Sequence, residues 1–314
     1  MSVLCITLNP AIDMTVSVDG LRVGEVNRAL SSQSDAAGKG LNAAQILADL
    51  GIDTIASGFL GADNAAIFEQ LFTDRQTMQG GSVQDGFVRV AGETRTNIKI
   101  TDNSTTTDIN GKGFLVSDAD KQMLFKQLGD LAKECQAVLV AGSLPQGFDV
   151  GDFDKLLSAL TAACDKVAVD VSGDALKVAF KHKLWLIKPN DDELFEVFHK
   201  PAKTLQEQRA LIVDLDIDNV IVSMGSQGVN WFAGDKVYQA TPPKMTVVST
   251  VGAGDTLVAG MMAGLLQGLD DLNALARATA LSAHAVSIVG FRAANDDELS
   301  RLLPQVEVRQ AADD

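Results

Sequence analysis

Short apolar runs alternate with longer segments of helical periodicity along most of the chain. The short runs predict buried strands, because each is too short for a helix and is bounded by turn residues; they cover residues 3–8, 138–140, 167–171, 184–187 and 220–222. Helical periodicity appears in residues 41–50, 119–133, 153–163, 205–213 and 257–266. Repeated strand–helix units predict an α/β fold with a parallel-sheet core flanked by helices on both faces.

Two regions interrupt this alternation with strand-like patterns that have no crossover helix between them. They comprise residues 14–18 and 26–30, and then residues 87–90, 96–101 and 105–110. We predict that they form a small antiparallel β-sheet that covers one end of the main domain as a lid. The predicted lid consists of the insertions 9–35 and 87–111, and the main α/β domain of residues 1–8, 36–86 and 112–314.

Composition narrows the class of protein. The chain has 314 residues and 46% hydrophobic residues, enough for one large α/β domain with a smaller insert. Its formal net charge of -15 argues against nucleic-acid binding, which needs a positive surface. The start carries no targeting pattern, and no apolar run reaches membrane-spanning length. With three cysteines that are not spaced for metal binding, a cytoplasmic protein is expected.

Polar residues follow the predicted strands closely. They are Asn9, Gly142, Ser143, Asp170, Lys188, Asn190, Ser223 and Gly225. In an open parallel sheet, ligands bind in the crevice outside the carboxyl ends of the strands. Several independent strands therefore direct polar residues toward one place, which predicts a single binding site there.

The most informative motif is S-T-V-G-A-G-D-T at residues 249–256, between an apolar extended run at 245–248 and the helical segment at 257–266. A strand that enters a helix through a glycine-rich turn forms an anion site, because backbone N–H groups and the helix dipole attract negative charge. Asp255 would repel a phosphate there, so we interpret it as the acceptor of a proton from an attacking alcohol. The alternative is an ordinary acid at a helix N-terminus.

Other nucleotide motifs do not fit these residues. Leu257 stands where a dinucleotide fingerprint requires its third glycine, and the chain has no P-loop pattern. Near the first helix, Lys39 offers a positive charge and Asn42 an amide for hydroxyl groups. Arg95 can pair with a phosphate through two parallel hydrogen bonds, or it can be an exposed strand arginine.

Two further loops suit a nucleotide. Lys188 can neutralise phosphate charge, while Asn190 and Glu193 can organise the water shell of Mg²⁺, which needs few protein ligands. The same two residues also match a capping box at a helix start, and that alternative stays open. The glycine-bearing loop 223–228 suits a nucleotide phosphate or ribose, or it is an ordinary turn.

The order and spacing of these motifs resemble the ribokinase-type (PfkB) carbohydrate kinases over essentially the whole chain. The resemblance is carried by the octet at 249–256, by G-K-G-x-N at 38–42 and by K-P-N-x-x-E at 188–193. Residues 7–13 and 142–145 are similar to the branch of this family that phosphorylates sugar phosphates. Many ribokinase relatives have Asp where Ser249 stands, so the resemblance does not imply their monovalent-cation site.

The resemblance implies roles for individual residues. Asp255 would be the catalytic base, and the N–H groups of Gly252, Ala253 and Gly254 would hold the moving phosphoryl group. Sugar hydroxyls would contact Asp13, Gly38 and Asn42, and the phosphate of the substrate would contact Lys39, Arg95, Ser143 and Arg28. Magnesium would be held by Glu193 and Asn190 through water. ATP would be bound by Lys188, Asn190, Ser223, Gly225, Ser226, Gly228, Thr250, Gly252 and Gly254.

The implied reaction transfers the γ-phosphoryl group of ATP to the 6-hydroxyl of fructose 1-phosphate. Fructose 6-phosphate and tagatose 6-phosphate are alternative substrates that the same residues could serve. An unphosphorylated sugar or nucleoside is disfavoured, because it would not need Lys39 and Arg95. A non-catalytic sugar-phosphate sensor is disfavoured because it has no use for Asp255. Because a lid sheet has exposed edges and lid-to-lid dimers occur in the family, a homodimer is expected.

Overall fold

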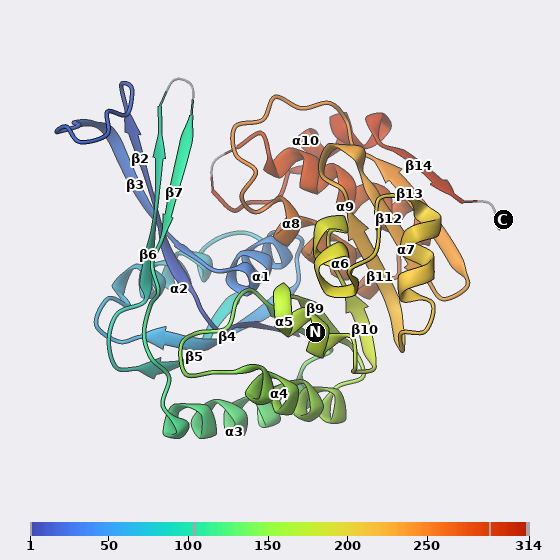
Figure 1. Ribbon diagram of the computed structural model, residues 1–314, viewed down its shortest axis with the longest axis horizontal. Helices are drawn as coiled ribbons and strands as arrows, with labels where there is room; N and C mark the ends of the chain where they lie inside the picture. Colours follow the sequence, from blue (N-terminus) through green and yellow to red (C-terminus); the bar gives the residue numbers. More distant parts are fainter. Residues whose placement is uncertain (1, 103–104, 289, 312–314) are drawn as a thin grey trace.

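A computed structural model describes residues 2–102, 105–288 and 290–311 of the chain (Figure 1). Within these residues a large sheet has ten strands in the order β14-β13-β12-β11-β10-β9-β8-β1-β4-β5. Their bounds along the chain are β1 Ser2–Thr7, β4 Asp53–Gly61, β5 Val83–Val90, β8 Ala137–Ala141, β9 Val167–Asp170, β10 Leu184–Ile187, β11 Ile217–Ser223, β12 Val229–Ala233, β13 Lys236–Thr241 and β14 Glu307–Gln310. Pairing is parallel from β5 to β11 and antiparallel from β11 to β14.

Helices cover both faces of the large sheet, because β1 is buried on both of its sides. Val3 and Cys5 pack into one hydrophobic core, and Leu4 and Ile6 into the other, because successive side chains of a strand point to opposite faces. The first core is covered by α1 Lys39–Asp49, α2 Ala66–Arg75, α8 Ala253–Leu266, α9 Asp271–Ala285 and α10 Asp296–Leu302. The second is covered by α3 Asp118–Glu134, α4 Val150–Ala163, α5 Gly173–Ala179, α6 Asp191–Phe198 and α7 Leu205–Ile212.

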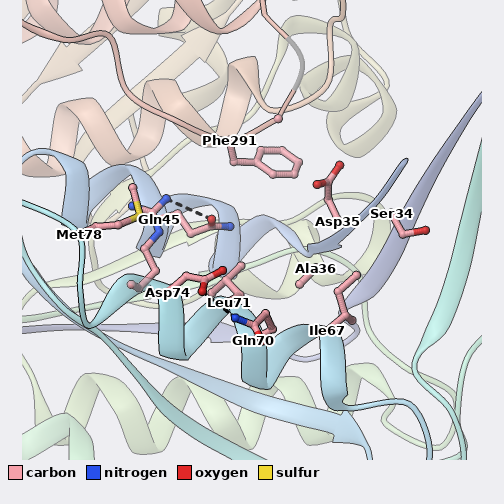
Figure 2. Close-up of a pocket in the computed structure, with 12 residues that line it drawn as sticks. Ser34, Asp35, Ala36, Gln45, Ile67, Gln70, Leu71, Asp74, Met78 and Phe291 are labelled. Atoms are coloured by element: carbon pink, nitrogen blue, oxygen red, sulfur yellow. Dashed lines mark hydrogen bonds between the residues drawn. The ribbon is translucent and has the colours of Figure 1, made fainter. Parts of the chain in front are cut away.

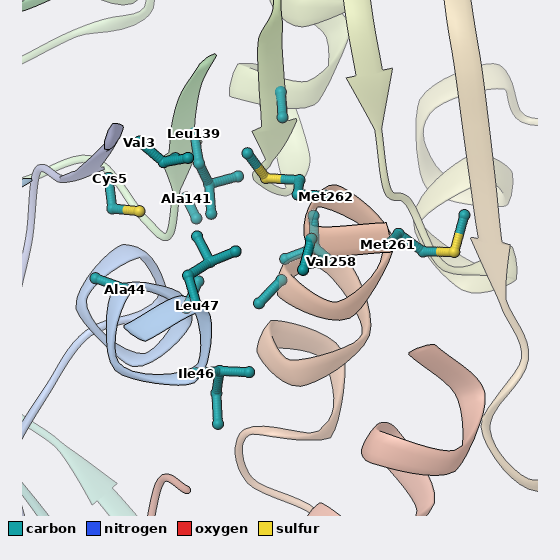
Figure 3. Packing of buried hydrophobic residues seen from close by; sticks show 14 of the residues in the cluster. Val3, Cys5, Ala44, Ile46, Leu47, Leu139, Ala141, Val258, Met261 and Met262 are labelled. Atoms are coloured by element: carbon teal, nitrogen blue, oxygen red, sulfur yellow. The ribbon is translucent and has the colours of Figure 1, made fainter. Parts of the chain in front are cut away.

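Helices α1 and α8 pack side by side on the same face of the sheet. Figure 3 shows Leu47 of α1 and Val258 of α8 directed toward each other beneath Val3 and Leu139 of the strands. In α8 small residues allow a second close approach, because a Cβ atom at Gly260 would lie 2.9 Å from the Cα atom of Ala278 in α9. This packing holds the N-terminal ends of α1 and α8 next to each other.

The small sheet is mixed, whereas the sequence predicted an antiparallel one. Its order is β3-β2-β6-β7, with bounds β2 Ala11–Val18, β3 Ala29–Ala37, β6 Arg95–Thr101 and β7 Thr106–Asn110. Strands β2 and β6 pair in parallel, so the prediction was wrong for this central pair. The reason is that each insertion contributes one antiparallel hairpin, and the two hairpins join through strands that leave the main sheet in the same direction. In Figure 1 this sheet rises from one end of the main domain.

Three other sequence predictions differ from the structure. Residues 87–90, expected in the lid, belong to β5 of the large sheet, where β5 pairs in parallel with β4. The strand expected at 26–30 begins instead at Ala29 and runs to Ala37. The strand expected at 245–248 is absent from the described residues, because Pro242 and Pro243 interrupt the chain after β13 and the valines beyond them are exposed. The division into domains otherwise remains a prediction.

Candidate active site

The start of α8 presents free main-chain N–H groups to the region above the sheet. Gly252 caps the helix with a left-handed backbone (φ 85°) and no side-chain cap, and its carbonyl accepts the N–H of Thr256 at 2.8 Å. A glycine suits this φ because a side chain there would be strained. The first N–H groups of a helix have no intrahelical acceptors, so Gly252, Ala253 and Gly254 form a cradle suited to an anion.

Asp255 lies in the first turn of α8 and is buried, with 6% of its surface exposed. Its Oδ2 atom accepts a hydrogen bond of 2.7 Å from Nδ2 of Asn42, at the start of α1. Burial, followed by the negative charge of Asp170, raises the pKa of Asp255 to about 6, while Lys39 and Lys188 oppose the rise. Asp255 is therefore largely ionised at neutral pH but can take up a proton easily, which is the property required of a general base.

Asp170, at the end of β9, binds two lysines from different elements. Its Oδ1 atom lies 3.4 Å from Nζ of Lys39 and 3.3 Å from Nζ of Lys188. Burial works against ionisation of this carboxyl, but the two cations hold its pKa below its usual range. The lysines are thereby fixed beside the helix start, since a Cβ atom at Gly254 would lie 3.4 Å from Nζ of Lys188.

Asn190 and Glu193 form a capping box at the start of α6. Glu193 N donates to Asn190 Oδ1 at 2.7 Å, and Asn190 N donates to Glu193 Oε2 at 2.8 Å. Burial raises the pKa of Glu193, whose charge also interacts with Lys188, Asp170 and Lys39. The capping interpretation is confirmed, and the capping bond uses only Oε2 of the Glu193 carboxylate. Within those residues no group of three or more acidic, His or Cys side chains could hold a metal ion.

The loop after β11 lies next to the loop after β10. An isolated parallel bridge links Asn190 with Ser223, and Ser223 N donates to the carbonyl of Pro189 at 3.1 Å. Gly225 and Ser226 belong to a short 3₁₀ helix on the exposed side of this loop. Position 228 requires a glycine whether or not it binds a ligand, because a Cβ atom there would lie 2.0 Å from the carbonyl oxygen of Ala240. Whether these residues bind a nucleotide stays a prediction.

Arg95 lies at the root of the lid, where the lid joins the main sheet. Its guanidinium donates to the carbonyls of Pro10 at 3.3 Å and Asn9 at 3.1 Å. The side chain of Asn9 donates to Oγ of Ser143 at 3.1 Å. Arg95, Asn9 and Ser143 are thus brought together, and the backbone beside Ser143 borders Lys39, because a Cβ atom at Gly142 would lie 3.7 Å from Cβ of Lys39.

Asp13 projects from β2 of the lid and accepts a hydrogen bond of 3.0 Å from Nδ2 of Asn97 in β6. Burial raises its pKa, with Asn97 and Arg95 opposing the rise.

Gly38 precedes α1 with a φ of 140°, and a Cβ atom there would lie 2.5 Å from the methyl carbon of Thr7. Gly38 therefore lets α1 begin directly above the end of β1, which sets the position of Lys39 and Asn42.

A cleft of about 570 Å³ lies between the lid and the segment that leads into α8. From the lid it is lined by Asp13, Asn97 and Lys99, among others, and from the main domain by residues 247–251, which include Thr250. Gly290 and Phe291 also line it. The cleft thus has polar side chains on its lid side and the approach to the helix start on the other.

Arg28 is not brought to this site within one chain. It is exposed and directly precedes Ala29, which pairs with Val18 at the far end of the lid, whereas Asp13 pairs with Asp35. Asp35 and Ala29 are six steps apart along the strand, which corresponds to about 20 Å at ~3.3 Å per step. The proposed contact of Arg28 with substrate phosphate gains no support from this position.

Sequence reasoning did not assign a role to Asp170, Asn97 or Asn9, although each has a clear place in the site. Asp170 and Asn9 each follow a predicted strand, so their position was a usable signal. What could not be read from the sequence is that Asp170 meets two lysines, because these come from α1 and from the end of β10. Asn97 gave a weaker signal, since it lies within the lid strand that holds Asp13.

Comparisons with known proteins agree with this geometry. Residues 3–298 match the model of the pfkB family of carbohydrate kinases. A 1-phosphofructokinase of Vibrio cholerae is 42% identical over 310 residues, covering 98% of this chain and 96% of the relative. A 1-phosphofructokinase of Escherichia coli K12 is 35% identical over 314 residues, with 98% of each chain covered.

Solved structures show the same fold. The Escherichia coli phosphofructokinase-2 in complex with substrates and products superposes with a TM-score of 0.85 at 22% identity, covering 97% of this chain and 99% of that one. The Arabidopsis thaliana ribokinase complexed with ribose and ATP gives a TM-score of 0.72 at 23% identity, covering 96% and 98%. The match over nearly the whole sequence, together with a buried carboxylate at a glycine-rich helix start, leads to one conclusion. The chain belongs to the pfkB family of carbohydrate kinases.

Proposed function

We propose that this kinase transfers the γ-phosphoryl group of ATP to the 6-hydroxyl of fructose 1-phosphate and releases fructose 1,6-bisphosphate and ADP. The observation that carries the proposal is the position of Asp255, buried beside the main-chain cradle at the start of α8 and within the field of two lysines. The choice of substrate is supported by the relatives that bear the name 1-phosphofructokinase at 42% and 35% identity.

In this proposal Asp255 accepts the proton of the attacking hydroxyl as the new P–O bond forms and the bond from phosphorus to the β-phosphate bridging oxygen breaks. The hydrogen bond from Asn42 fixes the orientation of the carboxylate. The N–H groups of Gly252, Ala253 and Gly254 stabilise the charge on the phosphoryl group in transit. Positioning and charge stabilisation account for most of the catalysis in phosphoryl transfer, because the protein itself makes no covalent bond.

The phosphate already present on the substrate would bind to Lys39, Arg95 and Ser143. These residues lie on the same side of the site, around Asn9 and Gly142. Asp13, Gly38 and Asn42 would contact the sugar hydroxyls, since Asp13 lines the cleft and Asn42, in the first turn of α1 after Gly38, holds Asp255. Arg28 takes no part within a single chain, because it lies at the far end of the lid.

As a carbohydrate kinase, the chain uses ATP as its co-substrate. We propose that Lys188, Asn190 and Thr250, with Ser223, Gly225, Ser226 and Gly228 of the neighbouring loop, bind it. A Mg²⁺ ion fits beside Glu193 and Asn190, mostly through water. The capping bond uses only Oε2 of Glu193, and the buried Oδ2 of Asp170 has no hydrogen-bond partner among the described residues, so both carboxylates keep oxygen atoms of the kind Mg²⁺ prefers. When bound, the ion would neutralise phosphate charge.

We further propose a cytoplasmic homodimer that associates through the lid. Apolar side chains that a monomer would leave in water lie on this sheet and its loop: Val23 is 95% exposed, Val26 82% and Leu30 70%. Replacing Val23 and Val26 with Ser should shift the protein from dimer to monomer in analytical ultracentrifugation. A monomeric wild-type protein would contradict the proposed dimer.

No helix in the described residues is long and apolar enough to cross a membrane.

The decisive experiment is a substrate panel with purified protein, ATP and Mg²⁺, read by coupled release of ADP. Fructose 1-phosphate should give the highest kcat/KM, ahead of fructose 6-phosphate, tagatose 6-phosphate and free fructose. A higher kcat/KM for fructose 6-phosphate or tagatose 6-phosphate would instead identify the protein as a sister kinase that acts on that substrate. Binding of sugar phosphate without ADP release, equal in the wild type and in Asp255→Asn, would favour a sensor and overturn the proposal.

A further inference from the structure

The connection from α9 to α10 contacts the segment that leads into α8. The carbonyl of Val286 accepts two N–H groups of the segment leading into the cradle, from Val248 at 2.7 Å and from Ser249 at 3.1 Å. Further along, the Phe291 ring rests on Gly252, because a Cβ atom at Gly252 would lie 3.0 Å from two ring carbons. The turn that shapes the cradle is thus held at both of its flanks by one connection.

Beyond Phe291 the connection is anchored by charged groups. Arg292 donates two hydrogen bonds to the carboxylate of Glu298 in α10, at 2.9 Å and 2.8 Å. The buried His284 of α9 has Nε2 at 3.4 Å from the same carboxylate. The N–H of Ala293 donates to Asp49 of α1 at 2.8 Å, and Asp49 in turn pairs with the buried Arg75 of α2. The end of the connection beyond Phe291 is therefore fixed to α1 and α10 of the main domain.

The helix that supplies the Asp49 anchor also carries Asn42, which holds Asp255. Helix α1 therefore fixes the carboxylate through its first turn and the connection through its last. A shift of the Phe291 ring would change the position of Gly252 relative to Asp255, because Asn42 holds the Asp255 carboxylate separately. This arrangement gives the ring a way to act on the reacting groups through the backbone.

The side of Phe291 that faces away from Gly252 is not tightly packed. The residue lies between the substrate cleft and a second cavity of about 320 Å³, which is bounded by α1, α2 and the end of β3. Figure 2 shows the ring above this cavity, with Asp35 on one side and Leu71 below. Because the cavity gives the ring room to move, its contact with Gly252 depends on the two anchors and on the ring's own size.

We propose that Phe291 is a positioning residue, which holds Gly252 so that the main-chain N–H groups of the cradle converge on the transferred phosphoryl group. This inference rests on the proposed function and adds a residue to it that carries no polar group. A main-chain cradle has no side chain that can adjust to a misplaced phosphoryl group, so its geometry must be fixed by neighbours. Gly252 has no side chain of its own, and the Phe291 ring lies against the position that its Cβ atom would take.

The test compares three variants of the full chain. Phe291→Ala should lower kcat at least tenfold and change the KM for sugar phosphate and for ATP less than threefold. Phe291→Leu, which keeps an apolar group over Gly252, should recover kcat to within about threefold of wild type. Met78→Ala is the matched control, because Met78 lines the same cavity without touching Gly252, and it should leave kcat unchanged.

A second readout does not depend on the sugar. ADP with aluminium fluoride and Mg²⁺ mimics the phosphoryl group in transit, and its binding is measured by calorimetry against ADP alone. Phe291→Ala should weaken the fluoride complex at least tenfold and leave ADP binding within threefold. Unchanged kcat and unchanged binding of the complex, or a rise in KM at constant kcat, would overturn the positioning role. A wild type that binds the complex but turns over no sugar phosphate would overturn the proposed function alone.

Discussion

Replacing Asp255 with Asn separates the chemical role of the carboxylate from its effect on stability. Asn keeps the size of the side chain and can still accept the hydrogen bond from Asn42, but it cannot take up a proton from a hydroxyl group. We expect kcat to fall by more than tenfold, a loss of over about 1.4 kcal/mol of transition-state stabilisation. ATP binding should stay close to that of the wild type, because the proposed nucleotide contacts come from other residues.

The same substitution should stabilise the fold at neutral pH. Burial raises the pKa of Asp255 from 3.8 to about 6, so the folded state binds the proton more tightly than the unfolded chain does. The favourable contribution is therefore complete below pH 3.8 and is lost as the pH rises toward 6. Above that range the ionised group costs about 3 kcal/mol, at ~1.36 kcal/mol per pKa unit. Asp255→Asn removes this cost and should be more stable by up to about that amount at pH 7.

Urea unfolding of both proteins at pH 7 and at pH 4 tests this reasoning. The stability difference should be largest at pH 7 and fall below about 1 kcal/mol at pH 4, where the folded wild type is protonated. A variant that is less stable than the wild type at both values would refute the claim that Asp255 is ionised at a cost. If kcat stays within about tenfold of the wild type, Asp255 is not the base.

Three further predictions concern the groups around Asp255. In the wild type, kcat should fall as the pH drops below about 6, because protonation of Asp255 removes the base; a kcat that stays constant from pH 7.5 to pH 5 would contradict this. Asp170→Asn should destabilise the protein by about 3 kcal/mol or more, since it leaves Lys188 buried without its counterion, and it should move the acidic limb of the kcat profile to lower pH by removing a negative charge near Asp255. A limb that moves upward instead would show that the lysines do not stay in place. Arg95→Ala should raise the KM for the sugar phosphate much more than the KM for ATP, and equal effects in steady-state kinetics would exclude its role in substrate binding.

The elements with an uninterrupted apolar pattern could be predicted from the sequence. Strand β10 was found with its exact bounds because all of its side chains are buried between two layers of helices. Strand β4 was missed because Ser57 and Gly58 interrupt its apolar pattern. The structure supplies the reason for Gly58, since a Cβ atom there would lie 1.9 Å from the carbonyl oxygen of Thr7 in the neighbouring strand. Such a close approach belongs to the pairing of strands and leaves no periodic signal in either strand.

The site shows the same division between local and long-range information. Local motifs pointed to Asp255, Asn42 and Lys188, because glycines and helix starts leave a local signature. The ion pairs of Asp170 and the contact of Phe291 with Gly252 depend on segments that are far apart in the chain. Similarly, the parallel pairing of β2 with β6 is decided by how two hairpins meet, which neither hairpin determines alone.

The parallel contact between β2 and β6 has a consequence for how this sheet can vary. Its halves are encoded on either side of α1, β4, α2 and β5, yet each half needs the other to complete its hydrogen bonding. A chimera that exchanged only one hairpin with a relative would have to pair a β2 and a β6 that come from different proteins. Recombination therefore has to transfer both hairpins together, and the intervening stretch that carries Lys39 and Asn42 would be inherited with them as one block.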